Sequence, residues 1–145
     1  MAKTSTYGHY CAAARALEVI GEKWSLLLVR DLLYGPHRFS DLARSLGGIT
    51  PKLLTNRLRE LEASGVVERD EEAGRREVWY RLTPAGKALR PAIDELLVWG
   101  VEHGKPPEPG EPVYPRRDGG SMVAIFNRRG ILPSAPTTWA LKLLA

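Results

Sequence analysis

The chain has 145 residues and a mass of 16.1 kDa; 43% of the residues are apolar and 26% are charged. One domain of this length buries about 68–70% of its unfolded surface, and the composition excludes wholesale disorder. No stretch approaches the roughly 18 apolar residues of a membrane span, and residues 1–9 lack a signal-peptide core, so we expect a soluble, cytoplasmic protein without a membrane partner. The net charge of +4 is compatible with a nucleic-acid partner but does not identify one.

The distribution of proline residues indicates two parts of the sequence. Seven of the 11 prolines lie beyond residue 104. We therefore predict a compact domain over residues 1–104 and a Pro-rich linker and tail over residues 105–145. The tail could dock on the domain, extend a dimer, line a ligand pocket or contact DNA through Arg116, Arg117, Arg128 and Arg129.

Two apolar segments follow the amino terminus. The first has apolar residues at i, i+3, i+4 and i+7, namely Ala13, Ala16, Leu17 and Ile20. This spacing predicts a helix with one buried face, ended by Gly21. Residues 24–33 are apolar almost all round, which predicts a central helix buried on most sides. Residues 35–36, Gly-Pro, then break the chain, and residues 37–39 fit only a very short strand or extended link.

A pair of short helices is predicted next. Ser40 is placed to cap a helix over residues 41–46, with Leu42 and Leu46 inward, that stops at the glycines of positions 47 and 48. Thr50-Pro51 is a strong helix start, because threonine accepts a hydrogen bond from an orphan amide and proline has no amide to satisfy. This second helix should reach about residue 64.

The second short helix is predicted to be amphipathic. At 100° per residue its inward face carries Leu54, Leu58 and Leu61, with Leu53 at the edge. The opposite face is polar and basic and carries Lys52, Thr55, Asn56 and Arg59.

Two strands and a last helix complete the predicted domain. Residues 66–69 and 77–82 indicate a hairpin with a charged turn over residues 70–76, and Val78, Tyr80 and Leu82 should face inward. Thr83-Pro84 repeats the helix start, and we expect the last helix to be kinked at Pro91.

The predicted order of elements is that of a mainly helical α+β protein, a winged helix-turn-helix. In that arrangement the helix from Thr50 is the recognition helix, where Lys52 and Arg59 can reach phosphates or guanine, Asn56 can pair with adenine, and Thr55 can contact base or backbone. Two further groups are candidate DNA contacts: Arg75 and Arg76 at the tip of the wing, and Arg38, Arg44 and Arg57 toward the phosphate backbone.

The segment from Cys11 to His103 resembles the HxlR-type winged-helix transcriptional regulators of prokaryotes. The resemblance rests on ALEVIGEKWSLLLVRDLLYGPHRFSDL, on GITPKLLTNRLRELEASGVVERD, on YRLTPAGKAL and on the closing Trp99-Gly100. It implies a homodimer paired through the first and last helices, a repressor or activator of neighbouring genes. The recognition helices would lie in successive major grooves of a pseudo-palindromic operator, about 34–36 Å apart. Such a protein would be associated with the nucleoid when bound.

Cys11 is the one cysteine of the chain and precedes the first predicted helix. Several proteins similar to this one carry there a cysteine that senses electrophiles or oxidants, and a helix amino end raises thiol reactivity. A redox switch would need an intersubunit disulfide or a mixed cap, since no second cysteine is present. The alternative is a packing role for Cys11 as a small apolar residue in a subunit interface. Ala12 stands where family members often have proline, which weakens the transfer of their geometry.

No other chemistry is indicated. His9, His37 and His103 share no metal-ligand spacing, so we predict no metal. We find no nucleophile beside a base and no phosphate loop, so we predict neither an enzyme nor a cofactor. Two rival interpretations remain: a sequence-nonspecific architectural DNA binder and a winged-helix protein-interaction module. A small-molecule or electrophile effector is also possible.

Overall fold

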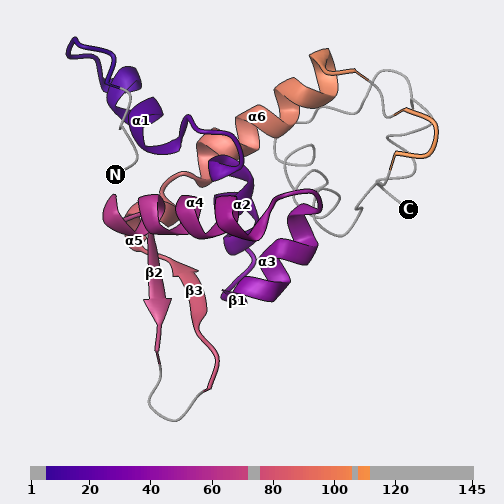
Figure 1. Ribbon diagram of the computed structural model, residues 1–145. Coiled ribbons are helices and arrows are strands. Elements are labelled where there is room, and N and C mark those ends of the chain that lie inside the picture. Colours follow the sequence, from indigo (N-terminus) through magenta and orange to yellow (C-terminus); the bar gives the residue numbers. More distant parts are fainter. Residues whose placement is uncertain (1–5, 72–75, 106–107, 112–145) are drawn as a thin grey trace. The chain divides into compact units, whose positions relative to one another are not determined.

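A computed structural model describes residues 6–71, 76–105 and 108–111 (Figure 1). The chain forms two compact units, residues 1–90 and residues 91–145. We predicted one domain over residues 1–104, and that boundary stays a prediction. Within the described ranges, no helix has the length and apolar character that crossing a bilayer requires.

The first unit begins with helix α1 (Ala12–Ile20), which ends at Gly21 as predicted. A Cβ atom at position 21 would collide with the carbonyl oxygen of Leu17, which accepts the Gly21 N–H at 2.8 Å. The predicted buried face of this helix is wrong in one respect: Ala13, Ala16 and Leu17 are exposed, and Ala14 is buried with Ile20. The cause is that burial depends on which neighbours pack against the helix, and periodicity does not specify them.

Helix α2 (Ser25–Leu32) is the central helix of this unit, as predicted. Leu28 and Val29 are fully buried, although Leu27 is 41% exposed. The buried carboxylate of Asp31 accepts hydrogen bonds from the Arg30 guanidinium at 2.9 and 3.0 Å and another from the Ser45 hydroxyl. This carboxylate links α2 to the next helix, because Ser45 belongs to α3 (Phe39–Leu46).

The link into α3 is the short strand β1 (His37–Arg38), as expected. The predicted cap at Ser40 is wrong: α3 begins two residues earlier than predicted, and the Asp41 side chain accepts the backbone N–H of Arg38 at 3.2 Å. Leu42 and Leu46 are buried as predicted.

Helix α4 (Pro51–Ala63) follows after a tight turn and matches its prediction closely. Its apolar face is buried, with Leu54, Leu58 and Leu61 at most 1% exposed.

Three antiparallel strands form the sheet, in the order β1-β3-β2. Strands β2 (Val67–Asp70) and β3 (Trp79–Leu82) pair with Val67 opposite Leu82 and Asp70 opposite Trp79, and form the hairpin that extends away from α4 in Figure 1. Tyr80 and Leu82 are buried as predicted. Val78 is 37% exposed and precedes β3 instead of joining it.

The predicted last helix is two helices. Helix α5 (Pro84–Lys87) starts with Thr83 as its cap, whose side-chain oxygen accepts the Gly86 N–H at 3.2 Å. Helix α6 (Arg90–His103) begins one residue before Pro91, so proline stands in its first turn and the expected mid-helix kink is wrong. Proline favours this position because its missing N–H has no intrahelical acceptor there.

The described architecture is thus mainly helical α+β with a small antiparallel sheet, and the first unit has the order of a winged helix-turn-helix. The residues after position 111 lie outside the described part, so the predicted tail and its arginines are not placed.

Candidate nucleic-acid interface

The turn between α3 and α4 holds the two helices in a fixed register. Gly47 and Gly48 have φ values of +46° and +84°, which glycine adopts without steric cost. Ile49 follows and is 8% exposed. The side-chain oxygen of Thr50 then accepts the N–H of Leu53 at 3.3 Å and caps α4, as the sequence predicts. The start of α4 is therefore fixed by glycine geometry, a buried side chain and a cap.

The outward face of α4 carries a stripe of three polar side chains with no partners among the described residues. Lys52, Asn56 and Arg59 are exposed, and none of them makes a hydrogen bond or ion pair with a residue that the structure describes. Their spacing of i, i+4 and i+7 places them above one another along the helix. Thr55 lies beside the stripe, half-buried, and donates its hydroxyl to the carbonyl of Pro51 at 2.9 Å. The stripe is available to a ligand.

Arg57 lies outside that stripe and is held by neighbours. Its side chain is only 14% exposed and pairs with Glu22 at 3.1 Å and with Glu60. Its Nε also donates to the carbonyl of Lys23 at 3.1 Å. Arg57 thus fastens the link between α1 and α2 to α4.

Arg38 is likewise committed to carboxylates. Its Nε donates to Asp41 at 2.9 Å, and Nη1 donates to both carboxylate oxygens of Glu77 at 3.0 and 3.1 Å. These interactions raise the pKa of Arg38, and the Arg38 guanidinium in turn lowers the pKa of Asp41. Arg44 is different: it is 76% exposed and lies 3.7 Å from Asp41.

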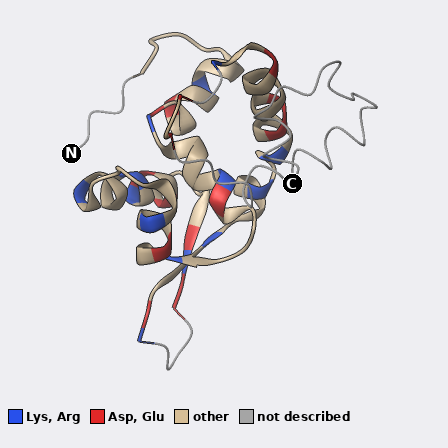
Figure 2. Ribbon diagram, turned by 90° about the vertical axis from the view of Figure 1, so that its right-hand side faces the viewer, with Lys and Arg blue, Asp and Glu red and all other residues tan. Residues whose placement is uncertain are grey.

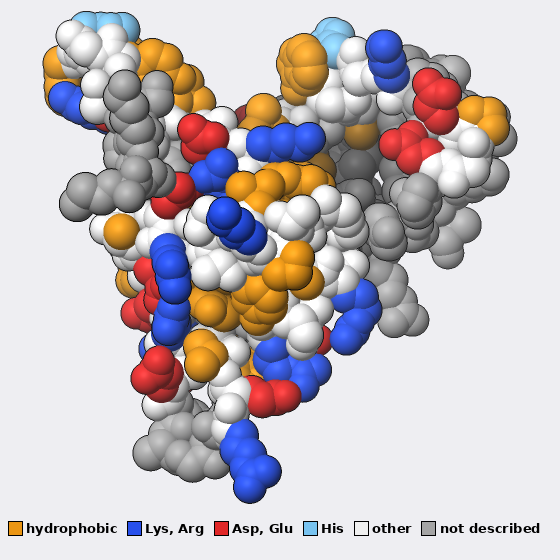
Figure 3. Space-filling view, viewed as in Figure 1, with side chains coloured by type: hydrophobic (Ala, Val, Ile, Leu, Met, Phe, Trp, Pro, Cys, Tyr) orange, Lys and Arg blue, Asp and Glu red, His pale blue; other side chains and the backbone are white. Residues whose placement is uncertain are grey.

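The described part of the hairpin carries both signs of charge, as Figure 2 shows. Glu68 and Asp70 face Arg81 at 2.8 and 3.7 Å. Arg76 is exposed and has no ion pair with a described residue, whereas Arg75 lies outside the described ranges. In Figure 3, blue side chains lie along α4 and near the hairpin tip.

Cys11 occupies the N-cap position of α1 and is exposed. It makes no capping hydrogen bond, but the nearby backbone amides of Ala14 and Ala13 lower the pKa of its thiol. Two nearby side chains that are able to interact with a thiolate, His9 and Arg15, make other contacts. The His9 ring nitrogen lies 3.0 Å from the carbonyl of Tyr7, and Arg15 pairs with Glu18 at 2.9 Å.

The carboxylates that bind the two held arginines were not anticipated. Glu60 lies three residues from Arg57 on one helix, and Asp41 three residues from Arg38, so the i, i+3 rule could have indicated both pairs. Glu22 and Glu77 are distant in sequence, and no local signal points to them. The described ranges contain no group of three potential metal ligands.

Several known proteins are similar to this chain in sequence. An uncharacterized HTH-type transcriptional regulator of Mycobacterium bovis is 43% identical over 105 residues, 70% of this chain and 64% of that protein. The chain therefore spans less than two thirds of the length of this relative.

Two solved structures are similar. The HTH-type transcriptional regulator YtcD, a Bacillus subtilis protein, has a TM-score of 0.61 at 39% identity, covering 65% of this chain and 97% of that one. The redox regulator HypR in its oxidized form has a TM-score of 0.62 at 35% identity, covering 66% and 100%.

The HxlR-like helix-turn-helix family matches residues 19–108, a range that contains the α3-turn-α4 unit and the hairpin. The resemblance noted in the sequence is thereby confirmed. The chain belongs to the HxlR-like helix-turn-helix family.

Proposed function

We propose that this protein is a sequence-specific DNA-binding transcriptional regulator that acts as a homodimer on a pseudo-palindromic operator. The observation that carries the proposal is the exposed stripe of Lys52, Asn56 and Arg59 on α4, opposite the buried leucines; these three side chains have no partner among the described residues. Side chains that no described residue engages keep their donors and acceptors for base edges and phosphates. The family match supports regulation, and not enzymatic activity, as the role.

Each α4 side chain has a distinct role in this proposal. Asn56 pairs with adenine, and Arg59 with guanine or phosphate. Lys52 stands in the first turn, where the exposed amides of the helix start also attract phosphate. Thr50 and Thr55 lie near the backbone as secondary contacts, and Thr50 already serves as the cap.

The wing and the surrounding arginines divide into two groups. Arg76, with Arg75, is proposed to meet the sugar-phosphate backbone or the minor groove, and Arg44 remains a phosphate candidate because it is largely exposed. Arg38 and Arg57 would have to leave carboxylate partners in order to bind phosphate. We therefore assign these two a positioning role.

Dimerisation is supported by apolar side chains that the single chain leaves in water. On α1, Leu17 is 46% exposed, and on α6, Leu96 and Trp99 are 52% and 61% exposed. Side chains of this size are commonly buried at homodimer interfaces. Two copies would present their α4 helices about 34–36 Å apart, one turn of B-DNA.

A thiol input is the proposed regulatory signal. Cys11 is exposed at the start of α1, its thiol has a lowered pKa, and a similar structure is that of a redox regulator. Oxidation at Cys11 would shift α1 and change the spacing of the two recognition helices, which lowers operator affinity. The alternative role is packing in the dimer interface.

The test is fluorescence anisotropy of the purified chain on its own upstream DNA and on a scrambled duplex, at several salt concentrations. We expect a preference of about 10³-fold for the operator and a steep decrease of affinity with salt. Equal affinity for both duplexes would favour an architectural DNA binder. Absence of salt-dependent binding to any duplex would favour a protein-interaction module.

A further inference from the structure

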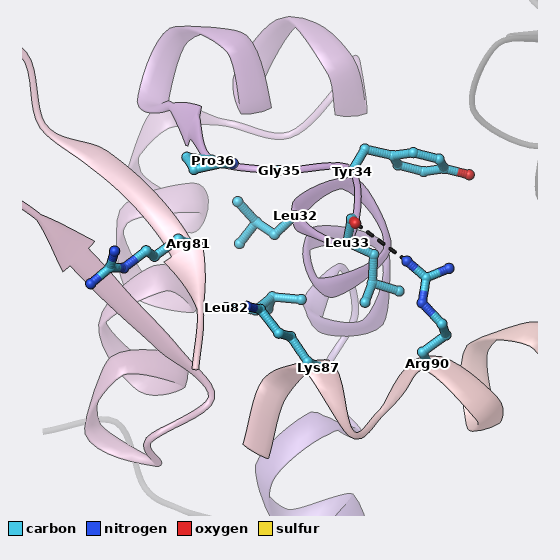
Figure 4. Close-up of a pocket in the computed structure, with 9 residues that line it drawn as sticks. All are labelled: Leu32, Leu33, Tyr34, Gly35, Pro36, Arg81, Leu82, Lys87 and Arg90. Carbon is cyan, nitrogen blue, oxygen red and sulfur yellow. Dashed lines mark hydrogen bonds between the residues drawn. The ribbon is translucent and has the colours of Figure 1, made fainter. Parts of the chain in front are cut away.

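A pocket of about 560 Å³ lies in the first unit (Figure 4), and its lining includes no residue of the α4 stripe. It is bounded by the end of α2, the link into β1, strand β3 and the segment from α5 to Arg90. Its lining residues are Leu32, Leu33, Tyr34, Gly35, Pro36, Arg81, Leu82, Lys87 and Arg90. The volume is within the range of about 300–1,000 Å³ that is common for small-molecule sites.

The floor of the pocket is apolar. Leu32 and Leu82 are each 3% exposed, and they come from α2 and β3. Figure 4 shows both side chains in the middle of the lining, with Leu33 and Pro36 beside them. A ligand that binds there must place a hydrocarbon surface against this floor.

The charged side chains of the lining are all positive. Three lining residues are cationic and none is acidic. Arg81 is already paired with Glu68 and Asp70, and in Figure 4 its guanidinium points away from Lys87 and Arg90. The positive charge that a ligand can use therefore comes from the other two side chains.

Lys87 and Arg90 are differently engaged. The backbone N–H of Lys87 donates to the Thr83 carbonyl at 2.9 Å, but its side chain makes no hydrogen bond or ion pair with any residue of the described ranges. One Nη of Arg90 donates to the carbonyl of Leu33 at 3.3 Å, which places the guanidinium at the α2 end of the pocket. Its other N–H groups make no hydrogen bond with a described carboxylate. Figure 4 shows the Lys87 side chain beside Leu82 and the Arg90 guanidinium beside Leu33, and a single anionic group would gain charge-assisted hydrogen bonds from both when the Lys87 side chain turns toward Arg90.

We propose that this pocket binds a small organic anion, a compact apolar or aromatic skeleton that carries one carboxylate. The skeleton lies against Leu32 and Leu82, and the carboxylate accepts hydrogen bonds from Lys87 and Arg90. An uncharged molecule of the same shape lacks these bonds, and an inorganic anion lacks the apolar contact.

A ligand in this pocket contacts the link that leads into the DNA-binding helices. Gly35, with φ of +124°, and Pro36 form the link from α2 into β1 and α3, and a His37 ring nitrogen lies 2.8 Å from the Gly35 carbonyl. A ligand against this link favours one placement of α3, and by linkage DNA binding changes ligand affinity by the same factor. This regulatory role rests on the proposed function, whereas the binding site does not.

The site is tested by calorimetry of the full chain with 2-naphthoate and with its uncharged analogue 2-naphthamide, at constant ionic strength. We expect saturable binding of 2-naphthoate and affinity for the amide lower by at least about fivefold. Lys87→Met and Arg90→Met should each weaken 2-naphthoate by about three- to tenfold and leave the amide unchanged. Lys105→Met, which removes an exposed lysine outside the pocket, is the matched control.

Lys87→Met tests the site even if Arg90→Met disturbs folding, because the Lys87 side chain has no described partner to lose and its backbone bond to Thr83 is kept. The proposal is overturned if acid and amide bind equally, if Lys87→Met binds 2-naphthoate as Lys105→Met does, or if no saturable binding occurs up to about 10 mM. Anisotropy with operator DNA then tests regulation separately. If the ligand binds and DNA affinity does not change, only the regulatory role is rejected. If the chain binds no DNA, the proposed function is rejected, and calorimetry still tests the ligand site.

Discussion

The Arg38 guanidinium donates to both carboxylate oxygens of Glu77, at 3.0 and 3.1 Å, across 39 residues of sequence. This contact joins the start of α3 to the segment that leads into β3. The same guanidinium lies 5.7 Å from the ring centroid of Trp79. Arg38 therefore connects the helix-turn-helix to the base of the wing.

This connection predicts how Arg38→Gln differs from Arg76→Gln. Removal of a phosphate contact lowers the slope of log affinity against log salt by about 0.9. We expect a reduction of about 1.8 for Arg76→Gln, because the proposed homodimer loses one such contact in each subunit, and the Arg76 side chain has no described ion pair. Arg38→Gln should lower operator affinity with an unchanged slope, because it loosens the wing without removing a phosphate contact. Equal slope reductions in the two variants would make Arg38 a phosphate ligand.

The recognition stripe predicts losses of base discrimination. Asn56→Ala and Arg59→Ala should each cost about 1–3 kcal/mol of binding free energy on the operator, because a bidentate contact to a base edge is lost. The operator and a scrambled duplex are compared by anisotropy at one salt concentration. An Asn56→Ala variant that loses the same affinity on both duplexes would remove Asn56 from the base-reading residues.

The buried carboxylate of Asp31 predicts a large effect on stability. Asp31→Ala leaves Arg30 and the Ser45 hydroxyl without this acceptor in a site where Asp31 is 2% exposed, so the free energy of unfolding should decrease by about 3 kcal/mol. Glu68→Ala is the matched control, since this exposed ion pair contributes about 0–1 kcal/mol. Urea denaturation measures both, and a similar small change in the two variants would contradict the structural role of Asp31.

Local features were predictable from the sequence, because their causes are local. Thr50-Pro51 caps and starts α4 as predicted, and the leucine periodicity gives its buried face. The Gly47-Gly48 stop follows from the same short-range rules, since only nearby backbone groups determine where a helix ends.

Features that depend on partners far apart in sequence were not predictable. Composition identified Arg38 and Arg57 as basic, but their acidic partners Glu77 and Glu22 are 39 and 35 residues away. The exposure of Leu17 on α1 has the same explanation, because its burial depends on neighbours that are distant in sequence or belong to another subunit. The break before α6 was not predicted, because the sequence alone does not show whether Pro91 lies inside a helix or in its first turn.

Asp41 predicts part of the acid sensitivity of the fold. Its folded-state pKa is lowered by Arg38, so its contribution to stability is present above the unfolded value of about 3.9 and is lost as pH falls through the folded pKa. Asp41→Asn should therefore be less stable than wild type at pH near 6, and the difference should shrink toward about pH 2. Urea unfolding across this range measures it. Glu71→Gln, which removes a carboxylate without a described ion pair, is the control, and parallel pH curves for wild type and Asp41→Asn would refute the assignment.

The position of Cys11 at the start of α1 predicts the reactivity of its thiol. The amides of Ala14 and Ala13 lower its pKa in the folded chain, so more of the thiol is thiolate at a given pH than in the unfolded chain. The rate of reaction with iodoacetamide should rise with pH around a midpoint below the value of about 8.5 for a free thiol, and the midpoint should return toward that value in urea. Identical midpoints in both states would contradict the effect of the helix start.

Reactivity alone does not make Cys11 a sensor, because an exposed thiolate also reacts in a protein that does not respond to it. The decisive comparison is operator affinity before and after mild diamide treatment, in wild type and in Cys11→Ser. If α1 transmits the oxidation, wild type loses affinity and recovers it with dithiothreitol, whereas Cys11→Ser binds the operator unchanged throughout. A Cys11→Ser variant that keeps the full oxidant response would show that the signal enters elsewhere and would leave Cys11 its packing role.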